Sequence, residues 1–337
     1  MVPALLTWFG RSARILPWRE AQGVRRDPYR VWLSEIMLQQ TTVPHAAPYF
    51  AAFTSRWPTV AALAAARDED VMQAWAGLGY YARARNLLKC AREVAARGAF
   101  PESETELRTL PGIGPYTAGA VAALAFGERT PAVDGNAERV FARLLALKED
   151  WAAAKKRIAL LARELVPADR PGAFAEALMD LGATVCTPKK PNCAVCPLTA
   201  LCAARAEGDP EHYPLKPAKA ARPVRYGRAY VLRRTGHVWL LRRAPSGLLG
   251  GMLALPSSDW REAREGCEPP LGAAWERLGE VRHVFTHFNL HLEVLAAETT
   301  DAGLPEGFWV SADDLTGLPS VFAKAVALAG LSARRKR

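Results

Sequence analysis

The stretch Leu110-Pro-Gly-Ile-Gly-Pro-Tyr-Thr-Ala-Gly119 decides how the first part of this chain folds, because it places two glycines in a tight turn and then opens a helix. Gly112 and Gly114 permit positive φ angles in such a turn. The bare backbone amides before a helix form a concavity that binds anions, and a phosphate of nucleic acid would suit it. A plain helix–turn–helix connection is the alternative, and the turn alone does not separate the two.

A carboxylate follows about one helix downstream, in Val133-Asp-Gly-Asn136. Asp134 lies where a helix over 137–147 is expected to begin, and a carboxylate in that position caps the first turn of a helix. Its place after the glycine turn also fits a functional role, but the spacing alone favours capping.

A second carboxylate, Glu35, lies in Trp32-Leu-Ser-Glu-Ile-Met-Leu-Gln-Gln-Thr41, among apolar neighbours that indicate a buried helix. Burial disfavours the charged form of a carboxylate. We therefore expect the pKa of Glu35 to be raised, so that it can deliver a proton near neutral pH. An ion pair with Arg19 or Arg30 is the alternative.

Two further groups of side chains suit nucleic acid. The amides of Gln39 and Gln40 can hydrogen-bond to base edges, although polar residues are common at helix ends. The stretch Gly77-Leu-Gly-Tyr-Tyr-Ala-Arg-Ala-Arg-Asn86 combines aromatic rings, which stack on bases or wedge between them, with arginines that hold phosphates. A helix start with a packed tyrosine and a solvated basic face explains the same pattern.

Four of the six cysteines fall within seventeen residues, spaced C-x6-C-x2-C-x5-C: Cys186, Cys193, Cys196 and Cys202. Sulfur ligands select iron–sulfur clusters, zinc or cuprous copper. Disulfides compete with this interpretation, but the chain shows no secretory signal, so an oxidising compartment is not expected. Zinc sites usually come as two close pairs, whereas this run has one C-x2-C. The spacing therefore favours a [4Fe–4S] cluster and leaves zinc open.

Length and composition predict two domains. Residues 1–204 read as helical, residues 205–222 as a proline-rich linker, residues 223–332 as a smaller α/β domain, and residues 333–337 as a basic tail. The sequence contains no run of eighteen apolar residues, so a membrane-spanning helix is not expected. The formal charge of +10 fits a polyanionic partner, although charge alone does not identify one.

Strand patterns support the α/β assignment of the distal domain. We expect a hairpin over 229–243 around the turn Thr235-Gly236. Residues 281–297 read as a strand pair or as one long strand, and a final helix is expected over 321–331.

Together and in this order, these motifs resemble the helix-hairpin-helix, Gly/Pro-Asp DNA glycosylases, and more narrowly the adenine DNA glycosylases of the MutY type. The resemblance covers nearly the whole chain and includes Leu16-Pro-Trp-Arg19 and Asp27-Pro-Tyr29. It implies an all-α helix-hairpin-helix glycosylase domain whose four-cysteine loop carries a [4Fe–4S] cluster. It also implies a C-terminal α/β domain of Nudix-like fold and double-stranded DNA as the partner.

The resemblance assigns roles to the carboxylates. Glu35 corresponds to the catalytic acid that protonates adenine at N7. Asp134 corresponds to the carboxylate that stabilises the oxocarbenium ion at C1′, after adenine has been flipped out of the stack. Asn136 matches a position that supports the sugar and Asp134, and Glu176 matches a residue of the adenine pocket. Tyr116 stands where related lyases carry the lysine that forms a Schiff base, so the resemblance implies a monofunctional enzyme.

The resemblance also implies a set of residues that bind DNA or the base: Arg19, Gln40, Leu78, Tyr80, Gly112, Gly114, Glu176, Phe285, Thr286 and His287. Gln40, Leu78 and Tyr80 match residues that insert around the lesion. The stretch 285–287 aligns with the F-S-H loop that recognises 8-oxoguanine, with threonine in place of serine. Threonine retains the hydroxyl group for hydrogen bonding, while its added methyl group bears on lesion discrimination.

The expected activity is excision of adenine paired with 8-oxoguanine or guanine, by a monomeric cytoplasmic enzyme that does not bind membranes. A pyrimidine-lesion glycosylase/lyase is one alternative, and Tyr116 and the distal domain argue against it. A catalytically silent lesion-binding or redox-sensing protein is another, and the presence of Glu35 and Asp134 argues against it. A nucleotide diphosphatase would need the acidic Nudix box, which the distal domain lacks.

Overall fold

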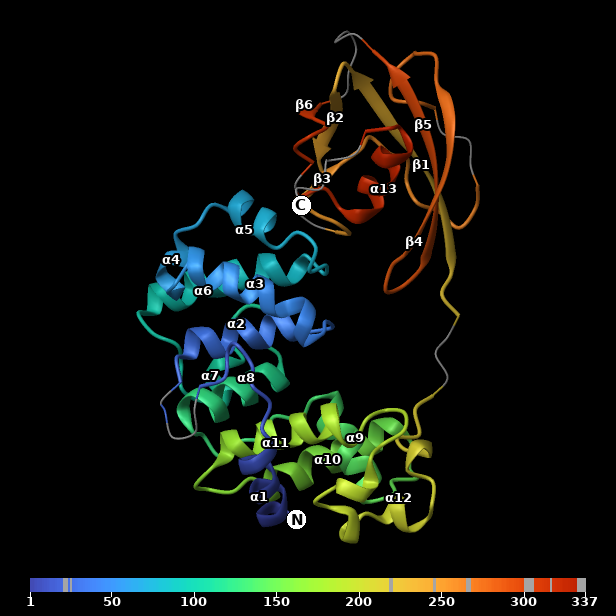
Figure 1. Cartoon of the computed structure of the whole chain (residues 1–337). Helices are drawn as coiled ribbons and strands as arrows, with labels where there is room; N and C mark the ends of the chain where they lie inside the picture. Colours follow the sequence, from blue (N-terminus) through green and yellow to red (C-terminus); the bar gives the residue numbers. More distant parts are fainter. Residues whose placement is uncertain are drawn as a thin grey trace. The chain divides into compact units, whose positions relative to one another are not determined.

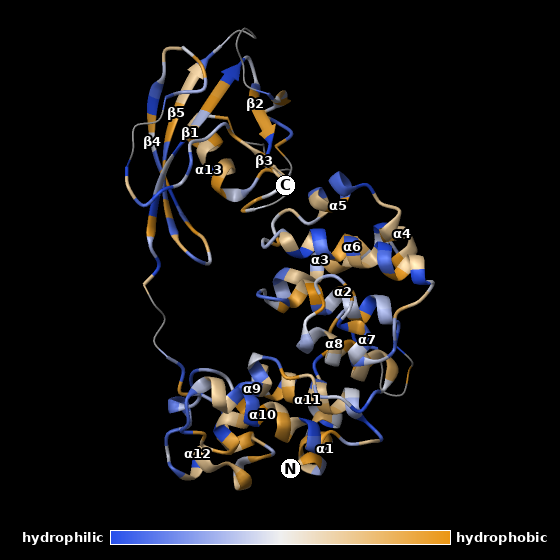
Figure 2. Cartoon of the chain, turned by 180° about the vertical axis from the view of Figure 1, so that it is seen from behind, coloured by the Kyte–Doolittle hydropathy of each residue, from blue (hydrophilic) through white to orange (hydrophobic). Residues whose placement is uncertain are grey.

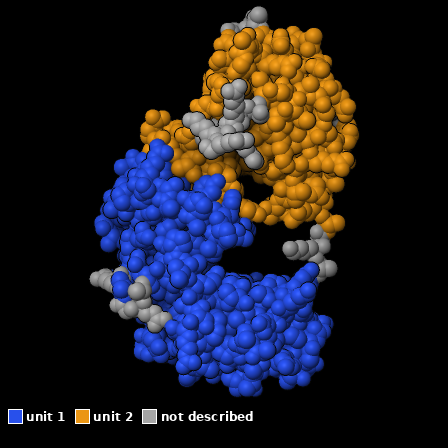
Figure 3. Space-filling model, in the orientation of Figure 1, with its two compact units in different colours: residues 1–66, 85–218 blue, residues 67–84, 219–337 orange. Residues whose placement is uncertain are grey.

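A computed structural model describes residues 1–20, 24, 26–217, 221–244, 247–264, 268–299, 306–315 and 317–331. The chain forms two compact units, residues 1–66 with 85–218 and residues 67–84 with 219–337 (Figure 3). No helix within the described ranges is long and apolar enough to cross a membrane. The basic tail expected at 333–337 lies outside the described residues.

The first unit is helical (Figure 1). The helices of the N-terminal part of the chain are α1 (Val2–Ser12), α2 (Pro28–Leu38), α3 (Val43–Arg56), α4 (Val60–Ala64), α5 (Asp68–Ala74), α6 (Ala82–Arg97), α7 (Glu104–Leu107), α8 (Pro115–Val121), α9 (Gly135–Leu144), α10 (Trp151–Leu165), α11 (Pro171–Thr184) and α12 (Ala203–Ala206). Of these, α5 and the first residues of α6 belong to the second unit. A π-helical stretch, η1 (Ala122–Phe126), continues α8 and ends at Gly127 in a left-handed conformation.

Two groups of helices make up the first unit. In one, α1 packs on α11, and α9 packs on α10 and α11, around fully buried residues such as Phe141, Ile158 and Phe174. In the other, α2 packs on α3 and α8. The stretch η1 contacts both α2 and α11, so α8 and η1 connect the two groups. The glycine turn and Asp134 flank this connection on either side in the sequence.

Two glycines allow segments of the chain to approach each other closely near the connection formed by α8 and η1. Gly112 has a φ of 75°, and a Cβ atom there would lie 2.7 Å from the Cβ atom of Asn86. A Cβ atom on Gly182 of α11 would lie 2.5 Å from that of Asn136, so only glycine lets α11 lie this close to the start of α9. Gly114 differs from the expectation, since it is the extended N-cap of α8 with a φ of −87°.

Besides α5 and the first residues of α6, the second unit holds a mixed sheet and the helix α13, with apolar residues concentrated in α13 and the central strands (Figure 2). Its elements are β1 (Val224–Arg234), β2 (His237–Arg242), β3 (Leu253–Ala254), β4 (Glu276–Val284), β5 (Asn289–Glu298), β6 (Phe308–Ser311) and α13 (Ser320–Leu328). The strand order is β3-β2-β1-β5-β4, and β6 pairs with β2. The pair β1–β5 is parallel and the other pairs are antiparallel.

The strand predictions are confirmed in outline. Arg234 pairs with His237 across the expected turn, which makes β1 and β2 the predicted hairpin. The stretch 281–297 is a strand pair, the ends of β4 and β5, and not one long strand. The final helix α13 packs Phe322 and Val326 against the sheet, and it ends at Leu328, before the predicted Leu331.

The first part of the expected linker at 205–222 packs onto the helical unit. Tyr213 is buried, its carbonyl oxygen accepts a hydrogen bond from Arg143 Nε (3.1 Å), and its hydroxyl donates to Glu207 (2.7 Å). A short 3₁₀ turn, Pro210–His212, precedes it. The composition predicts a linker here, and the buried side chain of Tyr213 packs this part of it onto the helical unit.

Candidate active site

Glu35 lies on a helix that is surrounded by protein. Of the residues from Tyr29 to Met37 in α2, all but Arg30 are buried, and Glu35 is 6% exposed. The hydroxyl of Tyr116, at the start of α8, donates a hydrogen bond to Glu35 Oε2 at 2.7 Å. Within the described ranges, neither Arg19 nor Arg30 forms the alternative ion pair with Glu35.

Burial raises the pKa of Glu35 to about 7. The hydrogen bond from Tyr116 opposes this shift, whereas the negative charges of Asp134 and Glu176 add to it. The expected raised pKa is therefore present, and near neutral pH a large fraction of Glu35 carries a proton that it can donate.

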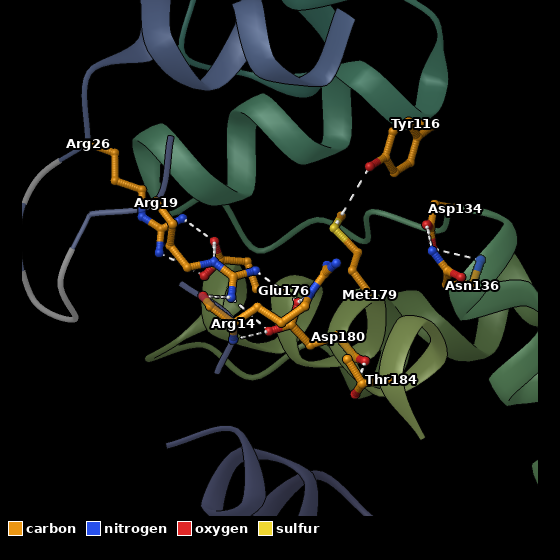
Figure 4. A network of polar contacts seen from close by, with 10 residues as sticks. All are labelled: Arg14, Arg19, Arg26, Tyr116, Asp134, Asn136, Glu176, Met179, Asp180 and Thr184. Atoms are coloured by element: carbon orange, nitrogen blue, oxygen red, sulfur yellow. Dashed lines mark hydrogen bonds and ion pairs between the residues drawn. The ribbon is translucent and has the colours of Figure 1, made fainter. Parts of the chain in front are cut away.

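Asp134 is the N-cap of α9, as its position predicted. Its Oδ1 atom accepts hydrogen bonds from the backbone N–H groups of Asn136 (3.0 Å) and Ala137 (2.8 Å). Its Oδ2 atom accepts a third from the Asn136 side-chain amide at 2.7 Å (Figure 4). Helix α9 ends at Leu144, earlier than expected. Capping and a functional role are compatible here, because the cap fixes the orientation of the carboxylate.

The two carboxylates differ in their surroundings. Glu35 is buried on α2, whereas Asp134 is partly exposed at a helix start, and its charge reaches Glu35 strongly enough to raise the pKa of that residue. The Tyr116 hydroxyl lies 3.9 Å from the sulfur of Met179 on α11. Two neighbouring carboxylates, one a proton donor and one anchored by N–H donors, suit acid-assisted cleavage of a glycosidic bond.

Glu176 and Asp180 of α11 form a buried ion-pair network with arginines (Figure 4). Asp180 is fully buried and accepts hydrogen bonds from Arg14 Nε (2.6 Å) and Arg19 Nη1 (2.7 Å). Glu176 accepts from Arg19 Nε (2.9 Å) and from both terminal nitrogens of Arg26 (2.6 and 2.7 Å). Burial alone would raise the pKa of Asp180, but the bonds from Arg19 and Arg14 outweigh it and lower that pKa.

The four cysteines of the run line one cavity together with Arg143, and none of the four is joined in a disulfide. The buried Arg143 donates to Cys186 Sγ at 3.4 Å and to the carbonyl oxygens of Thr187 and Pro188. Across the described ranges, no three Cys, His, Asp or Glu side chains converge closely enough to hold a single metal ion. Four cysteine sulfur donors around one cavity match the ligand set by which iron–sulfur clusters are held in proteins.

Arg139 connects the cysteine loop to the start of α9. Its Nε atom donates to the carbonyl oxygen of Cys186 at 2.8 Å, and its Nη2 atom donates to Asn136 Oδ1 at 3.0 Å. Asn136 in turn donates to Asp134. The loop and the partly exposed carboxylate are therefore joined by a continuous chain of hydrogen bonds.

Comparisons with known proteins agree with this geometry. The family model described as "HhH-GPD superfamily base excision DNA repair protein" matches residues 33–168, and a NUDIX domain model matches residues 228–328. The adenine DNA glycosylase of Homo sapiens is 34% identical over an alignment of 382 positions, which covers 92% of this chain and 70% of that protein. The adenine DNA glycosylase of Buchnera aphidicola subsp. Acyrthosiphon pisum is 32% identical, and the alignment covers 86% of this chain and 83% of that protein. The chain belongs to the adenine DNA glycosylase family.

The fold prediction for this adenine DNA glycosylase is thereby confirmed: a helix-hairpin-helix domain followed by a Nudix-like domain. A solved thermostable thymine-DNA glycosylase matches with a TM-score of 0.55 and 30% identity, over 61% of this chain and 95% of that one. The enzyme is an adenine DNA N-glycosylase of base excision repair, and its partner is DNA.

Two predicted base-binding residues of the glycosylase lie within the ion-pair network. Arg19 was expected to bind DNA or the base, but its side chain is only 10% exposed and its donors go to Glu176, Asp180 and the Arg14 carbonyl oxygen. Glu176 is close enough to Glu35 to raise the pKa of Glu35. Sequence reasoning missed Arg14, Arg26 and Asp180. The four-residue spacing of Glu176 and Asp180 on one helix face was the available signal.

Gln40 is exposed and has a positive φ of 59°, as a turn residue after α2. Its neighbour Gln39 points inward, and its amide donates to Thr117 Oγ1 at 3.2 Å. Of the two amides, only that of Gln40 is exposed for contact with DNA in this conformation.

Leu78 and Tyr80 belong to the second unit and differ in exposure. Leu78 is buried, with its side chain packed within the protein. Tyr80 is 47% exposed at a positive φ of 48°. The Arg83 guanidinium lies over the Tyr80 ring, 5.5 Å from its centroid, and over the ring of Trp75. Arg83, near the start of α6, therefore packs on aromatic rings of the protein, as the alternative of a packed helix start describes.

The predicted lesion-recognition loop of the glycosylase joins β4 to β5. The backbone N–H of Phe285 donates to the carbonyl oxygen of Phe288 at 2.9 Å, which closes the turn and leaves Thr286 and His287 exposed. The Phe285 ring stacks on Phe288 at 4.8 Å and lies 5.5 Å from Trp260. Phe285 therefore anchors the loop, while the next two side chains are free to meet a ligand.

Proposed function

We propose that this adenine DNA glycosylase hydrolyses the glycosidic bond of adenine paired with 8-oxoguanine or guanine and leaves an abasic site. The observation that carries the proposal is Glu35, a buried carboxyl group with a pKa of about 7, next to the anchored carboxylate of Asp134. A proton donor and a fixed anion at one sugar are the two groups that departure of a purine requires.

In the proposed reaction, adenine leaves the base stack and enters the site beside Glu35. Glu35 donates its proton to N7, the C1′–N9 bond breaks, and its electrons remain on the departing adenine. The positive charge at C1′ is then stabilised by Asp134, whose orientation Asn136 maintains. Water adds to C1′ and gives up one proton, which restores the acid form of Glu35.

Tyr116 supports a monofunctional reaction. A Schiff base with C1′ needs an amine, and the phenol at this position cannot form one. Its hydroxyl instead donates to Glu35 at 2.7 Å, which orients the acid. The proposed product is therefore an intact strand with an abasic site.

We further propose that Cys186, Cys193, Cys196 and Cys202 hold a [4Fe–4S] cluster. When bound, such a cluster cross-links the loop that carries its ligands. Lys189 and Lys190 lie exposed in this loop, where a fixed backbone would present them to phosphates. Recognition of 8-oxoguanine is assigned to Thr286 and His287 at the exposed end of the β4–β5 turn.

A panel of duplexes tests this function. Release of free adenine should be fastest opposite 8-oxoguanine, slower opposite guanine, and slowest opposite thymine. The strand should break only after alkali treatment, and borohydride should trap no protein–DNA adduct. Strand cleavage without alkali, or release of an oxidised pyrimidine in place of adenine, would instead support the glycosylase/lyase alternative.

A further inference from the structure

Helix α11 presents two buried carboxylates to the N-terminal segment of the chain. Glu176 and Asp180 lie four residues apart, on one face of the helix, and are 5% and 0% exposed. Three arginines from the segment before α2 meet them, so the network holds more positive than negative charge. Charges buried to this extent persist in folded proteins only when they are paired and hydrogen-bonded.

Arg26 contributes the most direct contact to Glu176. Its two terminal nitrogens donate separately to the two carboxylate oxygens, at 2.6 and 2.7 Å, while Arg19 adds a third bond to Oε1. The Arg26 side chain is 14% exposed. A two-pronged pairing of this kind fixes both the plane of the carboxylate and its charge.

A carboxylate held in this way can only accept hydrogen bonds. The 6-position of adenine carries an amino group, a donor, whereas hypoxanthine and guanine carry an oxygen acceptor there. An acceptor facing another acceptor in a buried site leaves both without a partner, which costs far more than the loss of an ordinary contact.

We infer that Arg26 is a positioning residue that holds Glu176 as a fixed acceptor for the 6-amino group of the flipped base. By this means it sets the preference for amino-purines over oxo-purines. The inference rests on the proposed function, because it takes Glu176 to face the excised adenine. Arg26 itself contacts Glu176 and acts on the base only through it.

The test compares single-turnover release of adenine, of purine without a 6-substituent, and of hypoxanthine, each placed opposite 8-oxoguanine. Arg26→Met should slow adenine release at least about tenfold relative to the parent and purine release less than about threefold. Arg26→Lys keeps the charge but loses the two-pronged geometry, so its rate of adenine release should lie between those of the parent and of Arg26→Met. Retained purine release shows that the variant is folded. Arg157→Met, an exposed arginine paired with Glu149, is the matched control and should behave like the parent.

A double-mutant cycle completes the experiment. Arg26→Met combined with Glu176→Gln should be no slower on adenine than Glu176→Gln alone, within about threefold, because one residue acts through the other. Equal losses on adenine and purine, or additive losses in the double variant, would overturn the role of Arg26 alone. A parent enzyme that releases no adenine opposite 8-oxoguanine would overturn the proposed function and this inference with it.

Discussion

Replacing Tyr116 with phenylalanine should move the pH profile of excision upward, because the lost hydroxyl stabilises the charged form of Glu35. Burial raises the pKa of Glu35 to about 7 against the opposing hydrogen bond from Tyr116 at 2.7 Å. A hydrogen bond to a charged acceptor is worth about 1 kcal/mol more than one to a neutral acceptor. Since 1.36 kcal/mol corresponds to one pKa unit, the pKa of Glu35 should rise by about 0.7 in the variant.

The sign follows from the role of Glu35 as an acid. Activity is complete while the group is protonated and is lost as the pH rises through its pKa. At about pH 8.5 the parent should retain roughly 3% of its maximal single-turnover rate and the Tyr116→Phe variant roughly 15%. The assay is adenine release from about pH 5.5 to pH 9.5, with each profile scaled to its own plateau. An unchanged midpoint, or one displaced to lower pH, would refute the reasoning.

Three further predictions follow from the same contacts. Glu35→Gln should abolish excision yet stabilise the fold by roughly 3 kcal/mol at about pH 8 and by much less at about pH 4. The reason is that the pKa of the Glu35 carboxyl group is raised from 4.5 to about 7, so the parent protein loses stability as the pH rises through that range. Equal urea midpoints of parent and variant at both pH values would contradict this. Asp180→Asn should lower the free energy of unfolding by about 3 kcal/mol, since it removes a fully buried charge that pairs with Arg19; a loss below about 1 kcal/mol in urea denaturation would argue against the network. Replacing both Lys189 and Lys190 with alanine should weaken binding of lesion and undamaged duplexes alike. It should also reduce the slope of log binding constant against log salt concentration by about two. A loss of lesion discrimination at unchanged salt dependence would exclude phosphate contacts.

The sequence predicted best what depends on near neighbours. Apolar residues on both sides of Glu35 indicated a buried helix, and burial alone sets most of its raised pKa. The turn at Thr235-Gly236 predicted its hairpin, and the position of Asp134 predicted its capping bonds. For the hairpin and the cap, the decisive interactions lie within a few residues of the signal.

Contacts between distant segments escaped prediction. The hydrogen bond from Tyr116 to Glu35 joins residues of two helices, and the sequence gives no register between them. The pairing of Arg26 with Glu176 spans still more of the chain, and both residues alone look like ordinary surface charges. Tyr213 is buried although its neighbours are proline-rich and polar, and its carbonyl oxygen accepts a hydrogen bond from the distant Arg143. Such pairings are fixed by the packing of α2, α8, α9 and α11 and not by local propensity.

The central claim is that two carboxylates on different helices share the cleavage of one bond. Its most direct test is single-turnover release of adenine from a duplex with adenine opposite 8-oxoguanine, by the parent, Glu35→Gln and Asp134→Asn. The parent should release adenine, and each variant should lose at least about a hundredfold in rate while still binding the duplex. Release by either variant at close to the parental rate would contradict the account.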